Sequence, residues 1–286
     1  MKLVWKKRIF NPYTLCVLIA LPVVTVLFQG FDTGLLPKFW QQLSPGESAA
    51  GDDLSIFSHV RHMEAFVDVM EWYVSYSKNL IPLLAAFSVI PFIQLRDRFL
   101  PFACVRIQHP RRTERKWIVQ SVVLSGCTVY GAYLLTMLWA RWMCTDTYHD
   151  YNCFEVFFNQ WGWQLTGQEH PYLYILALGA LRCLILPMLM AMLTIAVSYL
   201  TKKIYIYLLI PTIYYLVMCS ICSQSGRQDR WPLPLFSPEN MVWPSSPSYW
   251  QFGHNVHGIW GVVCASLIII VPSLVIIWWG MRKRRA

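Results

Sequence analysis

Long apolar stretches alternate with shorter polar segments along the chain, and this pattern sets the predicted architecture. A membrane-spanning helix needs about 20 mostly apolar residues. Six stretches are interpreted as spans on this basis, at residues 10–28, 80–95, 118–140, 172–200, 204–222 and 259–280. We therefore predict an all-α integral membrane protein in which the whole chain, 1–286, forms a single domain with six transmembrane helices.

Composition and charge give this architecture an orientation. Hydrophobic residues make up 56% of the chain and charged residues 14%, whereas soluble domains carry about 25% charged residues. Lysine and arginine are retained on the cytoplasmic side of membranes. Placing both termini there puts 17 of the 24 basic residues, but only two of the 15 acidic residues, on that side. We expect a multi-pass protein of the cytoplasmic membrane, with the segment 96–117 inside and the loops 29–79, 141–171 and 223–258 outside.

The first outer loop contains a further helical pattern before the second predicted span. From residue 54 onward, apolar side chains recur at intervals of three and four residues. That spacing is typical of a helix with one apolar face, so we expect an outer amphipathic helix that leads into the second span. Its apolar face is formed by Ile56, Phe57, Val60, Met63, Phe66, Val67, Met70 and Val74.

The segment 96–117, RDRFLPFACVRIQHPRRTERKW, is the most polar stretch between two apolar runs, with seven basic residues and two acidic ones. Phe99 and Phe102 lie between Arg98 and Arg106, so a short helix here would present both apolar and cationic groups to a soluble partner. This composition predicts a docking segment. The alternative is a cationic cluster that lies on anionic lipid headgroups.

Arg182 lies inside the fourth predicted span. A charged side chain within a bilayer is costly and marks a candidate functional site, here one on a transport pathway. The alternative is that Arg182 extends to the outer headgroups or pairs with an acidic residue of the first outer loop, such as Asp68 or Glu71.

Two cysteines, Cys144 and Cys153, lie in the second outer loop, well clear of the bilayer on the oxidising side. They are a candidate disulfide, although the sequence gives no geometry for it. Histidine pairs at 59/62 and 254/257 have a spacing that could bring two metal ligands to one helical face. Because they lack cysteine or acidic partners at tight spacing, we expect no metal site.

Several classes of chemistry are disfavoured by what the sequence lacks. It contains no GxxxxGK[ST] phosphate-binding loop, so the chain is not expected to hydrolyse ATP itself. No acidic residue falls within the predicted apolar spans, which removes the intramembrane carboxylates on which membrane metalloenzymes and proton-coupled carriers depend. We expect no enzymatic activity in this chain. Its net charge of +9 follows from topology and does not indicate nucleic acid as a partner.

Two parts of the chain carry patterns that are also found in a known family of membrane proteins. The first comprises LIPLLAAFSVIPF, RDRFLPFACVRIQHPRRTERKW and IVQSVVLSGCTVYGAYLL, and the second comprises MLTIAVSYLTKKIYIYLLIPTIYYL and FSPENMVWP. Together with the predicted six-helix topology, they are similar to ABC-2-type transporter permeases of the Firmicutes type. The chain departs from that pattern at Leu100, Pro101 and Trp117 in the central turn, and at Arg182.

The resemblance implies a coupling helix that docks on a cytosolic ABC ATPase, and ATP and Mg²⁺ would then bind to that partner rather than to this chain. It also implies a second permease subunit, identical or related, in the same bilayer. The docking residues carried over from the resemblance are Arg98, Phe99, Phe102, Arg106, Gln108, Arg111, Arg112 and Glu114.

The leading hypothesis is therefore a permease subunit that exports an amphipathic or lipophilic substrate, for example an antimicrobial peptide. The alternative is a membrane scaffold or sensor that docks a cytosolic partner through the segment 96–117 and transports nothing.

Overall fold

The computed structural model describes residues 11–32, 66–103, 110–144, 170–223, 236–238 and 258–283. Within these ranges the chain is helical and contains no strand, which confirms the predicted all-α class for the part described. The main elements are α2 (Pro12–Asp32), α5 (Phe66–Ser77), α6 (Ile81–Ala103), α7 (Pro110–Met143), α9 (Pro171–Gly179), the π-helical turn η1 (Ala180–Ile185), α10 (Leu186–Leu200), α11 (Ile204–Ser223) and α14 (Gly258–Lys283).

Four helical stretches are long and apolar enough to cross a membrane: Arg112–Trp142, Pro171–Leu200, Ile204–Ile221 and Gly261–Lys283. They correspond to the last four predicted spans, so the protein is a multi-pass helical membrane protein. The first two predicted spans fall on α2 and α6. Both segments are helical, but α6 ends in a polar stretch that contains Arg96, Asp97 and Arg98.

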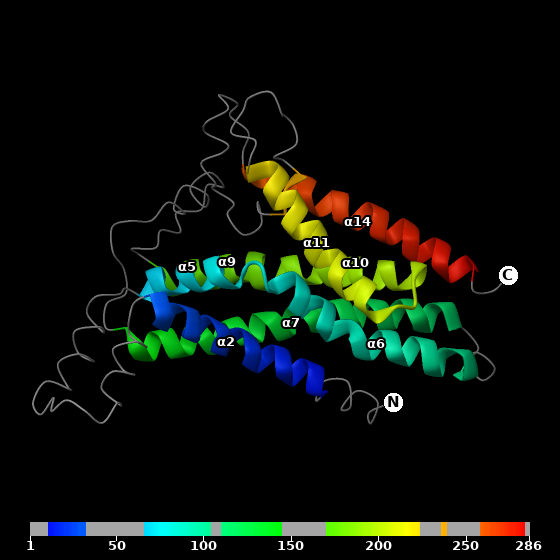
Figure 1. The fold of residues 1–286 in the computed structure, drawn as a ribbon, viewed down its shortest axis with the longest axis horizontal. Coiled ribbons are helices and arrows are strands. Elements are labelled where there is room, and N and C mark those ends of the chain that lie inside the picture. The colour runs from blue at the N-terminus through cyan, green and yellow to red at the C-terminus, as the bar shows by residue number, and fades with distance from the viewer. Residues whose placement is uncertain are drawn as a thin grey trace, which may run out of the picture.

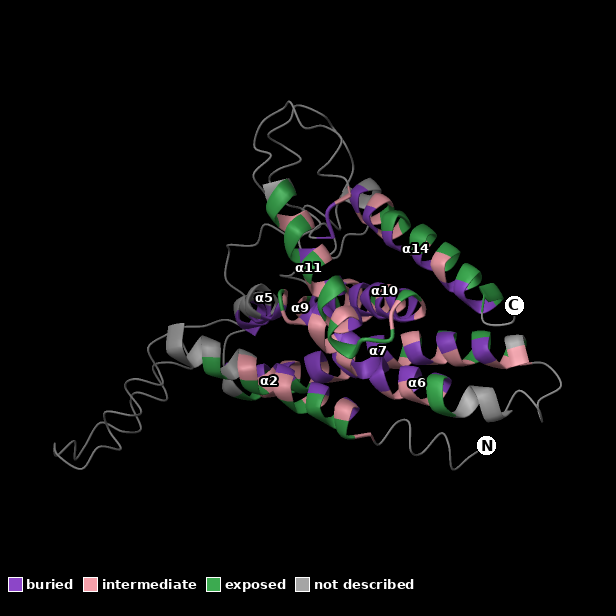
Figure 2. Cartoon of the chain, turned by 45° about the vertical axis from the view of Figure 1, so that its right-hand side comes forward, coloured by how far each residue is buried: buried purple, intermediate pink, exposed green. Residues whose placement is uncertain are grey.

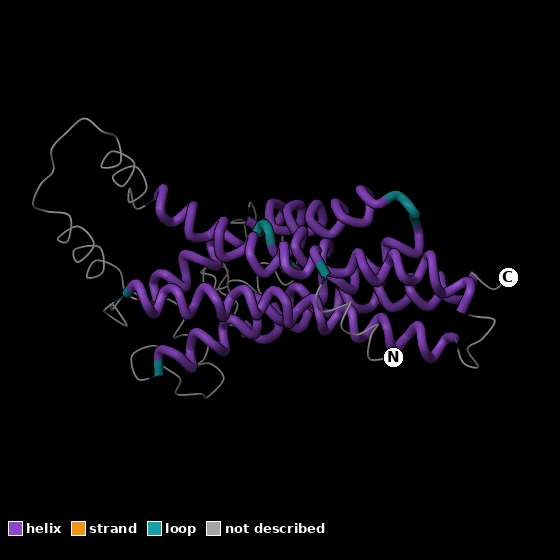
Figure 3. Tube along the Cα trace, turned by 90° about the horizontal axis from the view of Figure 1, so that it is seen from below, coloured by secondary structure: helices purple, strands orange, loops and turns teal. Residues whose placement is uncertain are grey.

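The helices run roughly side by side along the long axis of the molecule (Figures 1 and 3). The starts of α2, α7 and α11 and the ends of α6, α10 and α14 gather at one end of the bundle (Figure 1). We call it the basic end, because the described cations Arg96, Arg98, Arg112, Arg115, Lys116, Lys202, Lys203, Arg282 and Lys283 belong to these helix ends and to the turn 201–203. The segments that the sequence assigns to one side of the membrane therefore share one end of the fold.

Prolines explain two interruptions in the helices. A proline inside a helix lacks an N–H and clashes with the carbonyl four residues earlier. The helix α5 ends at Ser77, and α6 begins just before Pro82, which occupies the first turn where proline is tolerated. Similarly, Pro187 follows the π-helical turn η1, in which the N–H of Leu186 donates to the carbonyl of Leu181, five residues earlier. The fourth predicted span is consequently α9, η1 and α10 in succession.

Small residues on α7 allow the helices to pack closely. A Cβ added at Gly126 would lie 2.7 Å from the carbonyl oxygen of Leu184, so only glycine fits at this approach of α7 to η1 and α10. The hydroxyl oxygens of Ser88 on α6 and Ser125 on α7 lie 2.6 Å apart. Small residues have this role in helix packing in lipid, where burial of apolar surface supplies little driving force. These residues therefore pack α7 against its neighbours within one bundle.

Buried residues form two apolar clusters, one toward each end of the bundle, and exposed positions lie mainly on the outward faces of α2, α7, α11 and α14 (Figure 2). The helix α5 contributes Phe66, Val67 and Met70 of the predicted apolar face to the first cluster, together with Tyr73. The part of that predicted helix before Phe66 lies outside the described residues. The second cluster lies at the basic end, where Val89 and Ile93 of α6 meet Ala191 and Ile195 of α10. It forms the apolar floor of the site described next.

Candidate functional site

A fully buried arginine lies at the basic end of α6. Val89, Ile93 and Arg96 follow one another at helical spacing on the same buried face, so the backbone of α6 carries Arg96 inward toward α10. A buried guanidinium is costly unless its N–H groups are hydrogen-bonded. The environment of Arg96 meets that requirement.

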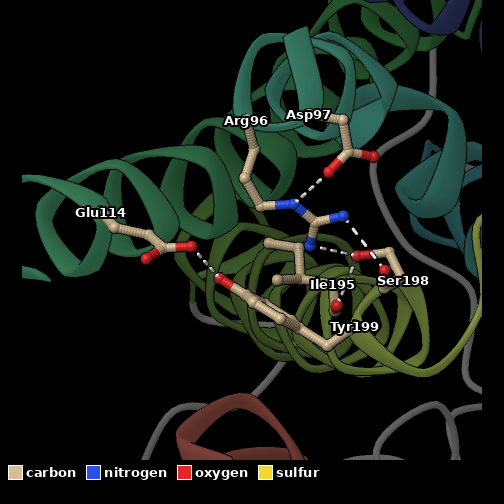
Figure 4. Close-up of polar contacts among 6 residues, drawn as sticks. All are labelled: Arg96, Asp97, Glu114, Ile195, Ser198 and Tyr199. Carbon is tan, nitrogen blue, oxygen red and sulfur yellow. Dashed lines mark hydrogen bonds and ion pairs between the residues drawn. The ribbon is translucent and has the colours of Figure 1, made fainter. Parts of the chain in front are cut away.

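The guanidinium of Arg96 donates three hydrogen bonds (Figure 4). Its Nη1 donates to the hydroxyl of Ser198 over 2.8 Å, its Nη2 to the carbonyl oxygen of Ser198 over 3.0 Å, and its Nε to the carboxylate of Asp97 over 2.9 Å. Ser198 lies in the last turn of α10, where backbone carbonyls lack partners within the helix and carry the negative end of the helix dipole. Arg96 therefore caps the C-terminus of α10 with a positive charge.

Tyr199 extends the contact from α6 to α7. Its ring lies under the guanidinium of Arg96, with 4.4 Å between Cζ and the ring centroid, which is a cation–π distance. Its hydroxyl donates to Oε1 of Glu114, in the first turns of α7, over 2.6 Å. Three helices thus meet at one group of polar side chains (Figure 4), which we call the Arg96 cluster: Arg96, Asp97, Glu114, Ser198 and Tyr199.

The Arg96 cluster holds both helices that flank residues 104–109. Arg96 comes seven residues before the end of α6, and Glu114 comes four residues after the start of α7. Both are buried against the end of α10, with Glu114 6% exposed. Around them, the side chains of Arg98, Arg112, Arg115 and Lys116 are exposed. The cluster therefore fixes the base of the cationic segment, while its outer cations remain available to a partner or to lipid.

The chemistry of the Arg96 cluster is that of a positioning site. Its hydrogen bonds are made by charged groups, which are stronger and more directional than neutral ones. The described residues include no group of three or more histidine, cysteine, aspartate or glutamate side chains that could hold a metal ion.

Six of the predicted docking residues lie in the two helices next to the Arg96 cluster, three in α6 and three in α7. Arg98 and Arg112 are exposed. Phe99, Phe102 and Arg111 lie in helices, but their side chains are outside the described part of the structure, and Arg106 and Gln108 lie wholly outside it. Glu114 differs from the rest, because its carboxylate faces the bundle and accepts a hydrogen bond from Tyr199. The docking role of all eight residues stays a prediction.

Arg182 lies in the π-helical turn η1 and is 1% exposed. Its side chain is enclosed by protein, as its neighbour Cys183 is. The side chains of Asp68 and Glu71 are not described, so both the predicted pairing with them and the predicted pathway role remain predictions.

Cys144 is buried just after the end of α7, and Cys153 lies outside the described residues. The disulfide between them stays a prediction. The histidines at 59, 62, 254 and 257 likewise lie outside the described ranges.

Sequence reasoning missed the roles of Arg96, Ser198 and Tyr199. In the sequence Arg96 belongs to the cations of the segment 96–117, but it also continues the buried spacing set by Val89 and Ile93. That spacing was the available signal for its burial. Its partner could not be found in the same way, because Ser198 is 102 residues away along the chain.

Comparisons of the chain with protein-family profiles, with curated proteins and with solved structures found no match.

Proposed function

We propose that this protein is the membrane-spanning permease subunit of an ABC transporter, with six spans, both termini in the cytoplasm and the basic end facing the cytosol. In this proposal the segment 96–117 docks on a separate ATPase that binds ATP and Mg²⁺. A second permease subunit, identical or related, completes the transporter. The substrate class that we propose is amphipathic or lipophilic, such as an antimicrobial peptide, and it is moved outward.

The observation that carries this proposal is the attachment of both ends of the cationic segment to α10. A docking segment can pass on the movement of a partner only if its ends are held by the helices that must respond. Arg96 and Glu114 provide that attachment from α6 and α7. A cationic cluster that only lay on lipid headgroups would need exposed charge alone, without a buried arginine at its base.

Replacing Phe99, Phe102 and Arg106 together by alanine is expected to release the ATPase that co-purifies with the solubilised protein, because the variant loses apolar and cationic contacts of the docking surface. Membrane insertion is expected to persist, since these residues lie outside the four apolar spans. The measurement is the amount of ATPase recovered on the tagged permease, compared with the amount recovered on the unmodified protein.

Alanine replacement of Lys202 and Lys203 provides the matched control for this experiment. Both are exposed cations at the basic end, in the short turn between α10 and α11. The control should retain the ATPase if docking is specific to the segment 96–117. Equal recovery of ATPase on the triple alanine variant would contradict the docking role and favour a scaffold or sensor with another mode of binding.

The proposed orientation predicts that Cys104 is reached by a thiol reagent only from the cytosolic side. The chain has nine cysteines, so the labelled peptide must be identified by mass spectrometry. An impermeant maleimide should label Cys104 in inside-out vesicles and leave it unlabelled in intact cells. Labelling of Cys104 in intact cells alone would place the basic end outside and overturn the orientation.

A further inference from the structure

The Arg96 cluster also contacts a fourth helix, α14, through Tyr199. A Cβ added at Gly280 would lie 2.6 Å from Cδ1, 2.7 Å from Cβ and 2.8 Å from Cγ of Tyr199. Real Cβ atoms do not approach other carbons so closely, so the absence of a side chain at Gly280 is what lets the tyrosine lie against the backbone of α14. Figure 4 shows Tyr199 between the guanidinium of Arg96 and the ribbon of α14.

The position of α14 depends mainly on α10. Of the described helices, α10 is the one that α14 packs against most extensively. At the basic end, Ile277 and Met281 of α14 belong to the same buried cluster as Ile195 and Ala196 of α10. Side chains of the last turns of α10, Tyr199 included, therefore determine where the end of α14 lies.

We infer that Tyr199 is the positioning residue through which α6 and α7, the two helices that hold the cationic segment, act on the basic end of α14. Its ring contacts Arg96 of α6 and Gly280 of α14, and its hydroxyl is bonded to Glu114 of α7. When the first turn of α7 shifts, the ring either follows Glu114 or loses that hydrogen bond. In both cases the surface that it presents to Gly280 changes.

This inference deepens the proposed function and rests on it for the source of the movement, which is the docked ATPase. The contacts themselves are a property of this chain alone. They can therefore be tested on the isolated full-length protein in lipid nanodiscs, without any ATPase.

The test measures amide hydrogen exchange in the last turns of α14, residues 276–283, for Tyr199→Phe, Glu114→Ala and the double variant. Tyr199→Phe removes the hydroxyl and keeps the ring. Neither substituted residue lies on α14, so a purely local role would leave exchange there unchanged. We expect each single variant to raise the exchange rate of this segment about threefold to tenfold, the range given by the loss of one net hydrogen bond. The double variant should show no further rise, because both changes remove the same bond.

Tyr205→Phe is the matched control, since Tyr205 is an exposed tyrosine at the start of α11. It should leave exchange in α14 unchanged. The reciprocal variant is Gly280→Ala, whose new Cβ must displace the Tyr199 ring. Because coupling between two sites is reciprocal, it should raise exchange in the first turns of α7, residues 110–117.

Unchanged exchange in α14 for both Tyr199→Phe and Glu114→Ala would overturn the inference, and so would additive effects in the double variant. These outcomes are distinct from failure of the proposed function. If the triple alanine variant of the docking segment keeps its ATPase while exchange in α14 responds as expected, the docking role is wrong and the coupling through Tyr199 stands. If the ATPase is released but exchange in α14 is unaffected, docking stands and the coupling is wrong.

Discussion

Replacement of Arg96 by alanine is expected to lower the free energy of unfolding by about 3 kcal/mol. The variant loses two hydrogen bonds to Ser198 and the cation–π contact with Tyr199. It also leaves the C-terminal carbonyl of Ser198 buried without its donor. The remaining partner, Asp97, is 36% exposed and can be hydrated, so we expect its share of the loss to be small. The measurement is reversible unfolding of the purified protein in mixed micelles with increasing SDS.

Two further variants separate the geometry of the guanidinium from its charge. Arg96→Lys keeps the charge but lacks the planar, fixed fork with which the guanidinium bonds the hydroxyl and the carbonyl of Ser198, so it should recover only part of the lost stability. Arg98→Ala removes an exposed arginine two residues away and should have little effect. If Arg96→Ala were no more destabilising than Arg98→Ala, the Arg96 cluster would not hold α6 to α10.

Hydropathy predicted where the helices are but not how far they extend. The third predicted span covers 118–140, whereas α7 runs from Pro110 to Met143. Its first two turns are rich in arginine and lysine, and a hydropathy window measures only the part of a helix that is apolar enough for lipid. Proline at the first position and good helix formers after it favour the longer helix. The same limit applies to α6, which continues past residue 95 to Ala103.

The candidate site was predictable in its location but not in its contacts. The excess of cations around residues 96–117 identified the segment. Which of its charges face outward and which face the bundle depends on how α6 and α7 are rotated against α10. That rotation is set by packing between residues about 100 positions apart, such as Arg96 and Ser198. A single sequence carries no direct record of such a pair, so it does not show that Tyr199 holds Glu114, one of the predicted docking residues, toward the bundle.

The second large effect on stability is expected at Gly126, where α7 packs closely against η1 and α10. We expect Gly126→Ala to lower the free energy of unfolding by about 2 kcal/mol, as overpacking of a tight core does. The new Cβ would lie 2.5 Å from Cγ of Met188 and 2.7 Å from the carbonyl oxygen of Leu184. The methionine side chain can rotate away, but the backbone carbonyl cannot, so α7 must move outward. Unfolding in mixed micelles measures the loss.

Gly131→Ala on the same helix is the matched control, because among the described residues its added Cβ would meet only Cδ2 of Leu18, at 3.4 Å. Alanine favours a helix over glycine by about 1 kcal/mol, so this variant should be neutral or stabilising. The same gain in helix propensity is available at position 126, and a net loss there must therefore come from the contact with Leu184. If both variants proved equally stable, the close packing of α7 on η1 and α10 would be wrong. The position of Glu114 relative to Tyr199, which depends on that packing, would then be in doubt as well.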